Sequence, residues 1–191
     1  SKWFACWWLG WNPEDRISIA SHTADLAEEF GGENRQFFEQ HGPELFGLEI
    51  DKRTNSRGKW RLKGHRGGMR AVGVGGGFHG HPIDLGIIDD PTKGRATAES
   101  SAARQKIKTW YNSDFLSGLS ENARVIIVQT RWHEDDLTGH VLTSAQENGE
   151  IWVTLNMPAI AFAPDEIPEE DHEECFPDPL GRQPGEPLCA D

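Results

Sequence analysis

The chain has 191 residues, of which 36% are hydrophobic and 26% are charged, and this balance indicates a folded domain with a sizeable core. No run approaches the roughly 20 consecutive apolar residues that span a bilayer, so we expect no membrane segment. Three widely separated cysteines, Cys6, Cys175 and Cys189, offer neither a zinc-binding spacing nor a disulfide framework and are typical of a reducing cytosol.

The formal net charge of −12 argues at first against a nucleic-acid partner, but the charge is unevenly distributed. Residues 165–178 hold eight acids and no Lys or Arg, whereas residues 52–70 hold eight Lys or Arg and no acid. The basic segment therefore remains a candidate for phosphate contacts.

The first predicted element is a helix over residues 1–11, because Trp3, Trp7 and Trp11 recur at the spacing of one helix face. We expect this aromatic stripe to pack against a sheet and not to stack on bases. Residues 16–20 (RISIA) then predict a short buried strand.

Two helical stretches are expected next. Residues 21–30 begin with cap-type residues and carry apolar side chains at helical spacing. Gly31-Gly32 predicts an interruption, after which residues 33–40 resume as helix.

The basic segment predicts a hairpin, because turn residues are followed by the alternation KWRLK, which puts Trp60 and Leu62 on one face. The later elements are a strand running into a loop over residues 69–82, a strand over 83–90, a helix from about Thr97, a central strand over 123–130 buried on both faces, a helix over 134–146 and a last strand over 151–157. Strands that alternate with helices indicate a three-layer α/β domain with a largely parallel central sheet.

Two of these strands end in polar residues. The strand over 83–90 ends in Asp89 and Asp90, and the strand over 123–130 ends in Gln129 and Thr130. If the strands are neighbours, these side chains converge in one crevice, which suits nucleotide hydrolysis: one carboxylate holds Mg²⁺ through its waters and a second orients or deprotonates the attacking water. An Asp-Asp-Pro turn explains the acid pair equally well.

A glycine-dense segment, GVGGGFHG (residues 73–80), precedes the acidic strand. It is no phosphate-binding loop, because no Lys or Arg lies between Val72 and Pro91, and it is no dinucleotide fingerprint, because a strand and not a helix follows it. Two interpretations stay open: a mobile loop, or a loop that reaches a phosphate or a neighbouring subunit.

The segment RWHEDDL offers His133, Asp135 and Asp136 within a short span, which could indicate a metal site. Acids at the start of a helix are also stabilised by the helix dipole, and that explanation is simpler. Arg131 and His133 leave the strand end beside the expected crevice, where they could sense a phosphate.

Together these motifs resemble a known family. GVGGGFHGHPIDLGIIDDPTKG, then VIIVQTRWHEDDLTGHVL about forty residues on, and DPLGRQPGEPL near the end closely resemble the large terminase subunit of tailed bacteriophages. The opening FACWWLGWNPEDRISIASHTADLAEEFG is similar to the stretch just after that family's phosphate loop. The resemblance covers nearly the whole chain, and QTRWHEDDL is its most specific piece.

The resemblance implies an ATPase of P-loop NTPase-like fold that drives double-stranded DNA into a viral procapsid and, in full-length form, also cleaves concatemeric DNA. It implies ATP and Mg²⁺ as cofactors, and the portal protein, the small terminase subunit and a homo-oligomeric ring on the procapsid as partners. The expected location is the host cell cytoplasm. By position, Asp89 resembles the Walker B magnesium aspartate, Asp90 the catalytic acid, and Gln129, Thr130 and Arg131 the coupling motif.

The chain departs from the family pattern at His79-Gly80-His81, where members tend to show Thr-Gly-Arg. An arginine in or near this loop can complete a neighbouring subunit's site in ring motors, whereas histidine is mostly neutral at pH 7. The candidate trans-acting residues are therefore Gly77, His79, His81 and Arg70, with Arg70 as the alternative source of charge.

The resemblance also predicts the organisation of the chain. We expect residues 1–158 to form the ATPase domain and residues 159–191 an acidic, proline-rich linker. By alignment, the phosphate loop belongs just upstream of Ser1 and the nuclease domain after Asp191. Without the phosphate loop, we expect the 191 residues alone neither to bind ATP tightly nor to hydrolyse it.

Two rival functions remain open. One is a metal nuclease that uses Asp89 and Asp90 directly. The other is a non-enzymatic DNA-binding or assembly module that uses Arg57, Lys59 and Arg61 of the basic segment. A simple solvated basic hairpin would explain the last three residues without any function.

Overall fold

The computed structural model describes residues 2–78, 80–163, 165, 167 and 178–188. The chain divides into two compact units, Ser1–Val141 and Leu142–Asp191. The sheet belongs to the first unit.

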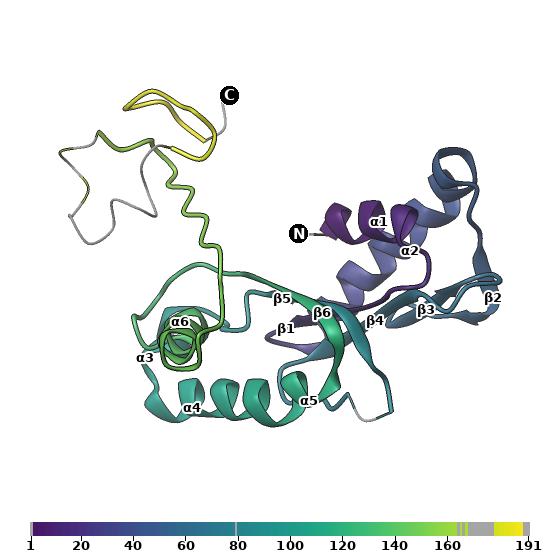
Figure 1. Cartoon of the computed structure of the whole chain (residues 1–191), viewed down its shortest axis with the longest axis horizontal. Helices are drawn as coiled ribbons and strands as arrows, with labels where there is room; N and C mark the ends of the chain where they lie inside the picture. The colour runs from purple at the N-terminus through teal and green to yellow at the C-terminus, as the bar shows by residue number, and fades with distance from the viewer. Residues whose placement is uncertain (1, 79, 164, 166, 168–177, 189–191) are drawn as a thin grey trace. The chain divides into compact units, whose positions relative to one another are not determined.

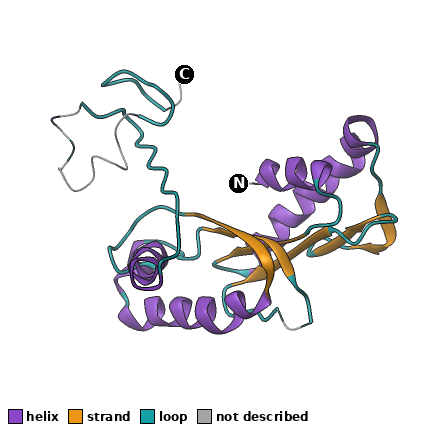
Figure 2. Cartoon of the chain, in the orientation of Figure 1, coloured by secondary structure: helices purple, strands orange, loops and turns teal. Residues whose placement is uncertain are grey.

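Six strands form one sheet in the order β2-β3-β4-β1-β5-β6 (Figure 2). The strands are β1 (Arg16–Ser21), β2 (Ile50–Asn55), β3 (Lys59–Leu62), β4 (Gly68–Gly73), β5 (Ile83–Asp89) and β6 (Leu119–Val128). Strands β4, β1, β5 and β6 run parallel, and β2 and β3 pair antiparallel beside β4. The predicted α/β class with a largely parallel sheet is confirmed, as are the early strand, the hairpin and the strand over 83–90.

One face of the sheet is covered by α2 (Ala24–Phe46), and α1 (Lys2–Trp11) packs on α2 (Figure 1). The buried face of α1 consists of Ala5, Cys6 and Leu9, which join the core. The predicted tryptophan stripe does not pack against the sheet: Trp3, Trp7 and Trp11 are 52%, 52% and 69% exposed. The smaller side chains of α1 form its buried contact, and Trp3 and Trp11 pack at the edge of α2 against Phe37 and Phe46.

Helix α2 is continuous, so the predicted interruption at Gly31-Gly32 is wrong. Gly31 is buried where α2 crosses the hairpin, and a Cβ there would lie 2.5 Å from the carbonyl oxygen of Arg57. The Gly31 carbonyl accepts a hydrogen bond of 3.1 Å from Trp60 Nε1. The glycine therefore permits close packing of the helix on the strand. Its cost is the low helix propensity of glycine.

The opposite face is covered by helices over β5. These are α3 (Arg95–Glu99), α4 (Ser101–Trp110), a π-helical turn η1 (Tyr111–Phe115) and α5 (Leu116–Gly118). The helix predicted from Thr97 is confirmed, with a break at Ser100. Phe115 packs directly on Gly86 of β5, where no side chain larger than hydrogen fits. Helices thus lie on both faces of the sheet (Figure 1).

Residues 123–128 of the predicted strand over 123–130 lie in β6, and the prediction that it is a central strand buried on both faces is wrong. Within the described part of the chain, β6 pairs only with β5 and forms an edge of the sheet. None of its residues is buried, and Val128 is 42% exposed. The β-branched composition reflects strand propensity, which edge and central strands share.

The predicted strand over residues 151–157 does not form. Its alternating apolar residues Ile151, Val153 and Leu155 are 94%, 82% and 67% exposed. Alternation supplies the propensity for a strand, but a strand also needs a partner for its backbone groups, and no described strand pairs with this one. The predicted helix over 134–146 forms as α6 (Leu137–Asn148).

In the last part of the chain, the described residues form a bridge between Ile160 and Pro187 and an ion pair of 2.7 Å between Asp178 and Arg182. The acidic stretch over 165–178 lies almost wholly outside the described residues. No helix within the described ranges has the length and apolarity that crossing a membrane requires.

Gly31→Ala is expected to lower the free energy of unfolding by about 1–3 kcal/mol, because the added methyl group meets the backbone of Arg57 and forces helix and hairpin apart. Gly32→Ala is the matched control, since its methyl group would meet only the flexible Arg57 side chain and should stabilise the helix by up to about 1 kcal/mol. Urea denaturation of both variants measures the difference. Equal effects of the two substitutions would contradict this packing.

Arg16 and Asp84 join the beginnings of β1 and β5 through bonds of 2.6 and 2.9 Å, and Ser120 Oγ donates to Asp84 Oδ1 at 2.7 Å. Burial would raise the pKa of Asp84, but these hydrogen bonds outweigh it and hold the pKa well below its usual value. The carboxylate therefore stabilises the fold above its unfolded-state pKa of about 4, and this contribution fades as the pH falls toward the folded-state pKa.

Asp84→Asn removes that titration. Urea unfolding measured between neutral pH and about pH 2 should show a shallower loss of stability on acidification in this variant than in the wild type. Parallel curves for the two proteins would mean that Asp84 contributes nothing to the pH dependence.

Candidate functional site

The carboxyl ends of the parallel strands form one edge of the sheet, which is where open α/β sheets bind ligands. Strand β5 pairs directly with β6, and Asp89 lies opposite Val128. The expectation that the strands ending in IIDD and IIVQT are neighbours is confirmed. Their polar residues therefore meet at the same edge.

Asp90 links three strand ends. Its N–H donates to the Val128 carbonyl at 2.9 Å, its carbonyl accepts from the His22 N–H at 3.3 Å, and its Oδ1 accepts from the Thr130 N–H at 3.1 Å. Its φ of 41° lies in the left-handed region, which non-glycine residues rarely adopt, although Asp is one of those that do. The carboxylate of Asp90 is thus held in place at an exposed position beside the end of β6.

Gln129 lies at the same edge with an unusual side chain. Its Oε1 and Nε2 are both buried and have no hydrogen-bond partner among the described residues. A buried amide without partners is costly, and in native proteins it commonly marks a place where a further polar group binds. Gln129 therefore fits a ligand that presents donors or acceptors beside Asp89 and Asp90.

The chemistry of the donors limits the metal that this edge could hold. Within the described residues, no group of three or more His, Cys, Asp or Glu side chains is placed to bind a metal ion. Mg²⁺ is commonly held by one or two carboxylates together with substrate phosphates and waters. Asp89, half-buried at the end of β5, and Asp90 fit that pattern, in which a phosphate-bearing ligand supplies the remaining oxygens.

The acids of RWHEDDL have structural partners. Asp136 is buried, accepts from Arg131 Nε at 2.8 Å and caps α6 by accepting from the Gly139 N–H at 3.0 Å. Asp135 is ion-paired with Arg104 and Lys108 of α4. These contacts favour the simpler explanation of the acids, stabilisation of a helix start, over a metal site.

Arg131 lies near the acidic edge but its guanidinium group is bound to Asp136. Its assignment to the coupling motif, like that of Gln129 and Thr130, stays a prediction. What the structure adds is the contact between the Thr130 backbone and Asp90, which ties the candidate coupling segment to the candidate catalytic acid.

The glycine-dense loop begins at the acidic edge and returns to the start of β5. Val74 N–H donates to the Ser21 carbonyl at 2.8 Å, and Trp110 Nε1 donates to the Gly76 carbonyl at 2.9 Å. Phe78 is buried against Trp110 and Phe115. The loop is therefore anchored by an aromatic side chain in its middle.

The candidate trans-acting residues are not gathered at the acidic edge. Gly77 lies in the loop, and His79 lies outside the described residues. Arg70 pairs with Ser18, three residues before the end of β1, and so lies about 10 Å from the edge along the strand. Arg70 and His81 instead line a pocket on the face of the sheet.

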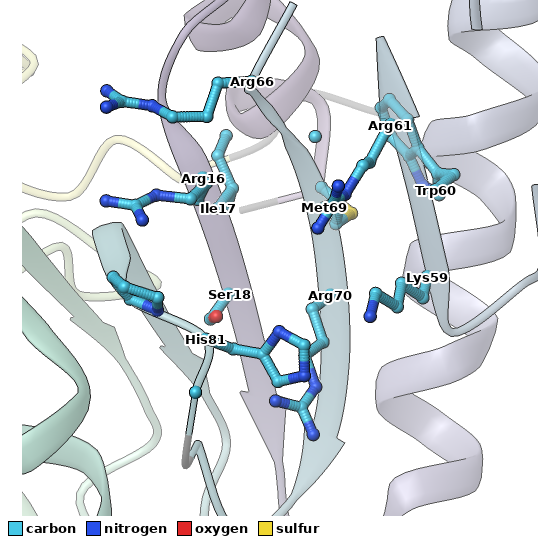
Figure 3. Close-up of a pocket in the computed structure, with 13 residues that line it drawn as sticks. Arg16, Ile17, Ser18, Lys59, Trp60, Arg61, Arg66, Met69, Arg70 and His81 are labelled. Carbon is cyan, nitrogen blue, oxygen red and sulfur yellow. The ribbon is translucent and has the colours of Figure 1, made fainter. Parts of the chain in front are cut away.

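That pocket has a volume of about 210 Å³ and is strongly basic (Figure 3). It brings together Lys59 and Arg61 of the predicted DNA-contact set with five further polar residues: Arg16, Ser18, Arg66, Arg70 and His81. Arg57, the third member of that set, lies elsewhere, beside Glu28 and Gly32 of α2. Sequence reasoning missed Arg16, because only the pairing of β1 with β4 brings it beside the basic hairpin. Arg66 lies within the basic segment but was not singled out there.

A comparison with protein families gives one finding. The model of a family described as the terminase large subunit, T4likevirus-type, N-terminal, matches residues 1–180. No curated protein matches the chain.

Proposed function

The chain belongs to the N-terminal family of the T4likevirus-type terminase large subunit and therefore to the proteins of phage DNA packaging; from this membership we propose that it is the ATP-hydrolysing part of the packaging motor. The observation that carries the proposal is the convergence of Asp89, Asp90, Gln129 and Thr130 at the carboxyl edge of parallel strands. On this proposal the sheet is that of a P-loop NTPase-like domain, and hydrolysis drives double-stranded DNA into the procapsid.

Each residue of the acidic edge has a part in this proposal. Bound ATP would supply the phosphoryl group, and Asp89 would hold, through waters, the Mg²⁺ that neutralises its charge, as a carboxylate at a strand end can. Asp90 keeps Oδ1 on the Thr130 N–H, which leaves its other carboxylate oxygen to orient the attacking water and take its proton. Gln129 donates to or accepts from the nucleotide, and Thr130 passes the change in Asp90 along β6.

The partners follow from the same family membership. The motor acts on double-stranded DNA at the portal, and we propose that the chain works in a homo-oligomeric ring on the procapsid with the small terminase subunit, in the host cell cytoplasm. We also propose that the complete protein cleaves concatemeric DNA. The rival interpretation, a metal nuclease built on Asp89 and Asp90 themselves, needs further acids at this edge, and the described residues supply no third ligand.

Residues 1–191 by themselves are expected to show only background ATP turnover in a phosphate-release assay. The sequence holds no G-x-x-x-x-G-K-[ST] loop, and that loop's backbone N–H groups and lysine normally grip the β- and γ-phosphates. Ordinary turnover by this chain alone would show that another segment grips the phosphates.

The second test uses the complete reading frame that encodes these residues. Asp90→Asn should lower DNA-stimulated ATP turnover by a factor of about 10²–10⁴, because the amide cannot take the proton of the attacking water. Glu99→Gln makes the same chemical change at an exposed position of α3, where Glu99 forms a loose ion pair of 3.8 Å with Arg95, and should leave turnover unchanged. Unchanged turnover in Asp90→Asn would remove Asp90 from the catalytic role.

A further inference from the structure

The two faces of the sheet are covered unequally. On the face opposite α2, Phe115 and its helix cover β5, and Phe78 anchors the crossing loop. The register places Lys59 beside Arg70 and Arg70 beside Ser18, so these side chains share this face on β3, β4 and β1. On this face, β3, β4 and β1 carry cationic side chains at positions that would be apolar if a helix covered them.

The charge of Asp51 acts on Arg61 without a direct contact, and three of the pocket's cations have no direct ionic partner among the described residues. Within the described ranges, Lys59, Arg61 and Arg70 form no ion pair, and Arg70 Nη1 is buried without a hydrogen-bond partner. Among the described residues, the Arg70 guanidinium lies over the Phe78 ring, whose centre is 6.0 Å away. An unsatisfied buried guanidinium nitrogen is costly, and a bound oxyanion would remove the cost.

The other two arginines of the pocket are already engaged. Arg16 is ion-paired with Asp84, and Arg66 Nε donates to the Glu14 carbonyl at 3.2 Å. Both arginines add positive charge at the rim of the pocket. Because each guanidinium group already has a partner, neither is a principal ligand for an anion. The ring of His81 lies on the other side of the pocket, and burial together with Arg70, Lys59 and Arg61 lowers its pKa, so it offers a neutral hydrogen-bonding nitrogen.

The shape of the pocket limits its ligand to a small anionic group. Lys59, Arg61, Arg70, Ser18 and His81 all line this pocket, and Figure 3 shows the His81 ring beside the Arg70 guanidinium. A volume of about 210 Å³ is below the roughly 300–1,000 Å³ of pockets that enclose whole small molecules. The pocket therefore encloses a phosphate group with water and leaves the rest of any larger ligand outside.

The position of the pocket separates it from the acidic edge. Its lining includes Arg16, Ile17 and Ser18 from the start of β1 and Pro82 just before β5, whereas Asp90 follows the end of β5. Along β1 the distance to the acidic edge is about 10 Å from Ser18 and Arg70 and about 20 Å from Arg16. A nucleotide held at Asp89 and Asp90 would therefore not place its phosphates in the pocket of the same chain.

We propose that this pocket binds one phosphate of the double-stranded DNA backbone, with Arg61 and Arg70 as its principal ligands and Lys59, Ser18 and His81 completing the grip. The choice of DNA over a free phosphate compound rests on the proposed function of the chain in packaging. Exposed Arg66 lies at the pocket, and Lys52 and Lys63 of the same basic segment are also exposed. Contact through phosphate alone carries no base specificity, as a motor that moves any sequence requires.

The test measures binding of the 191-residue chain to a short labelled duplex by fluorescence anisotropy, at several salt concentrations between about 50 and 200 mM. Arg61→Gln and Arg70→Gln should each weaken binding about tenfold, and each should reduce the slope of log K against log salt by about 0.9, the value for one lost phosphate contact. Arg53→Gln removes one charge from the same basic segment at an exposed residue that is paired with Asp51 and outside the pocket, and should change binding less than about twofold.

Thermal unfolding of each variant shows whether it is folded. If Arg70→Gln unfolds, Arg61→Gln still tests the proposal, because Arg61 is exposed and its substitution leaves the core intact. Equal effects of Arg53→Gln and Arg61→Gln would mean that duplex binding depends on general electrostatic attraction and not on the pocket. That result would overturn the proposal. Binding of ATP or inorganic phosphate that depends on Arg61, without binding of the duplex, would overturn the DNA assignment. None of these outcomes depends on ATP hydrolysis, so loss of turnover in Asp90→Asn would still stand if the pocket proposal failed.

Discussion

The parallel register of β1, β5 and β6 is the constraint on which the rest of the first unit depends. It brings Asp89 beside Val128 and lets the backbone of Asp90 bond to both neighbouring strand ends. The same register points Leu85 and Ile87 into the core and Gly86 toward Phe115. A slip of one residue would reverse every side chain of β5 and put a larger residue where Gly86 meets Phe115, so packing and site geometry are specified together.

The sequence predicted the parts of the fold that depend on local pattern. The α/β class, the basic hairpin and the two polar strand ends were read from alternation and from the residues that follow each strand. The predictions failed where packing overrode propensity: Gly31 serves close contact within a continuous helix, and the β-branched run of β6 lies at a sheet edge. The basic pocket could not be found in this way, because Arg16, Arg61 and Arg70 lie on three strands whose order only the tertiary structure shows.

Strand β1 belongs to both candidate sites. Arg16 and Ser18 near its start line the basic pocket, while the backbone of His22, directly after its end, bonds to Asp90. The central strands pack against α2 on one side, and β5 packs against the α4 region on the other, which makes the connection between the two places short and rigid. In the account proposed above, the acidic edge supplies the hydrolytic chemistry and the opposite end of the same strand holds the DNA backbone. A change at Asp90 would then reach the DNA contact through one strand, with no flexible element between them.

The central claim is that the chain belongs to a motor that couples ATP hydrolysis to DNA movement, and nuclease protection tests it most directly. The complete reading frame is mixed with matching procapsids, linear duplex DNA and Mg²⁺, and the DNA that survives nuclease digestion is measured. The account predicts protected DNA with ATP and none with a non-hydrolysable analogue. Hydrolysis of ATP that leaves the DNA fully accessible to nuclease would contradict it.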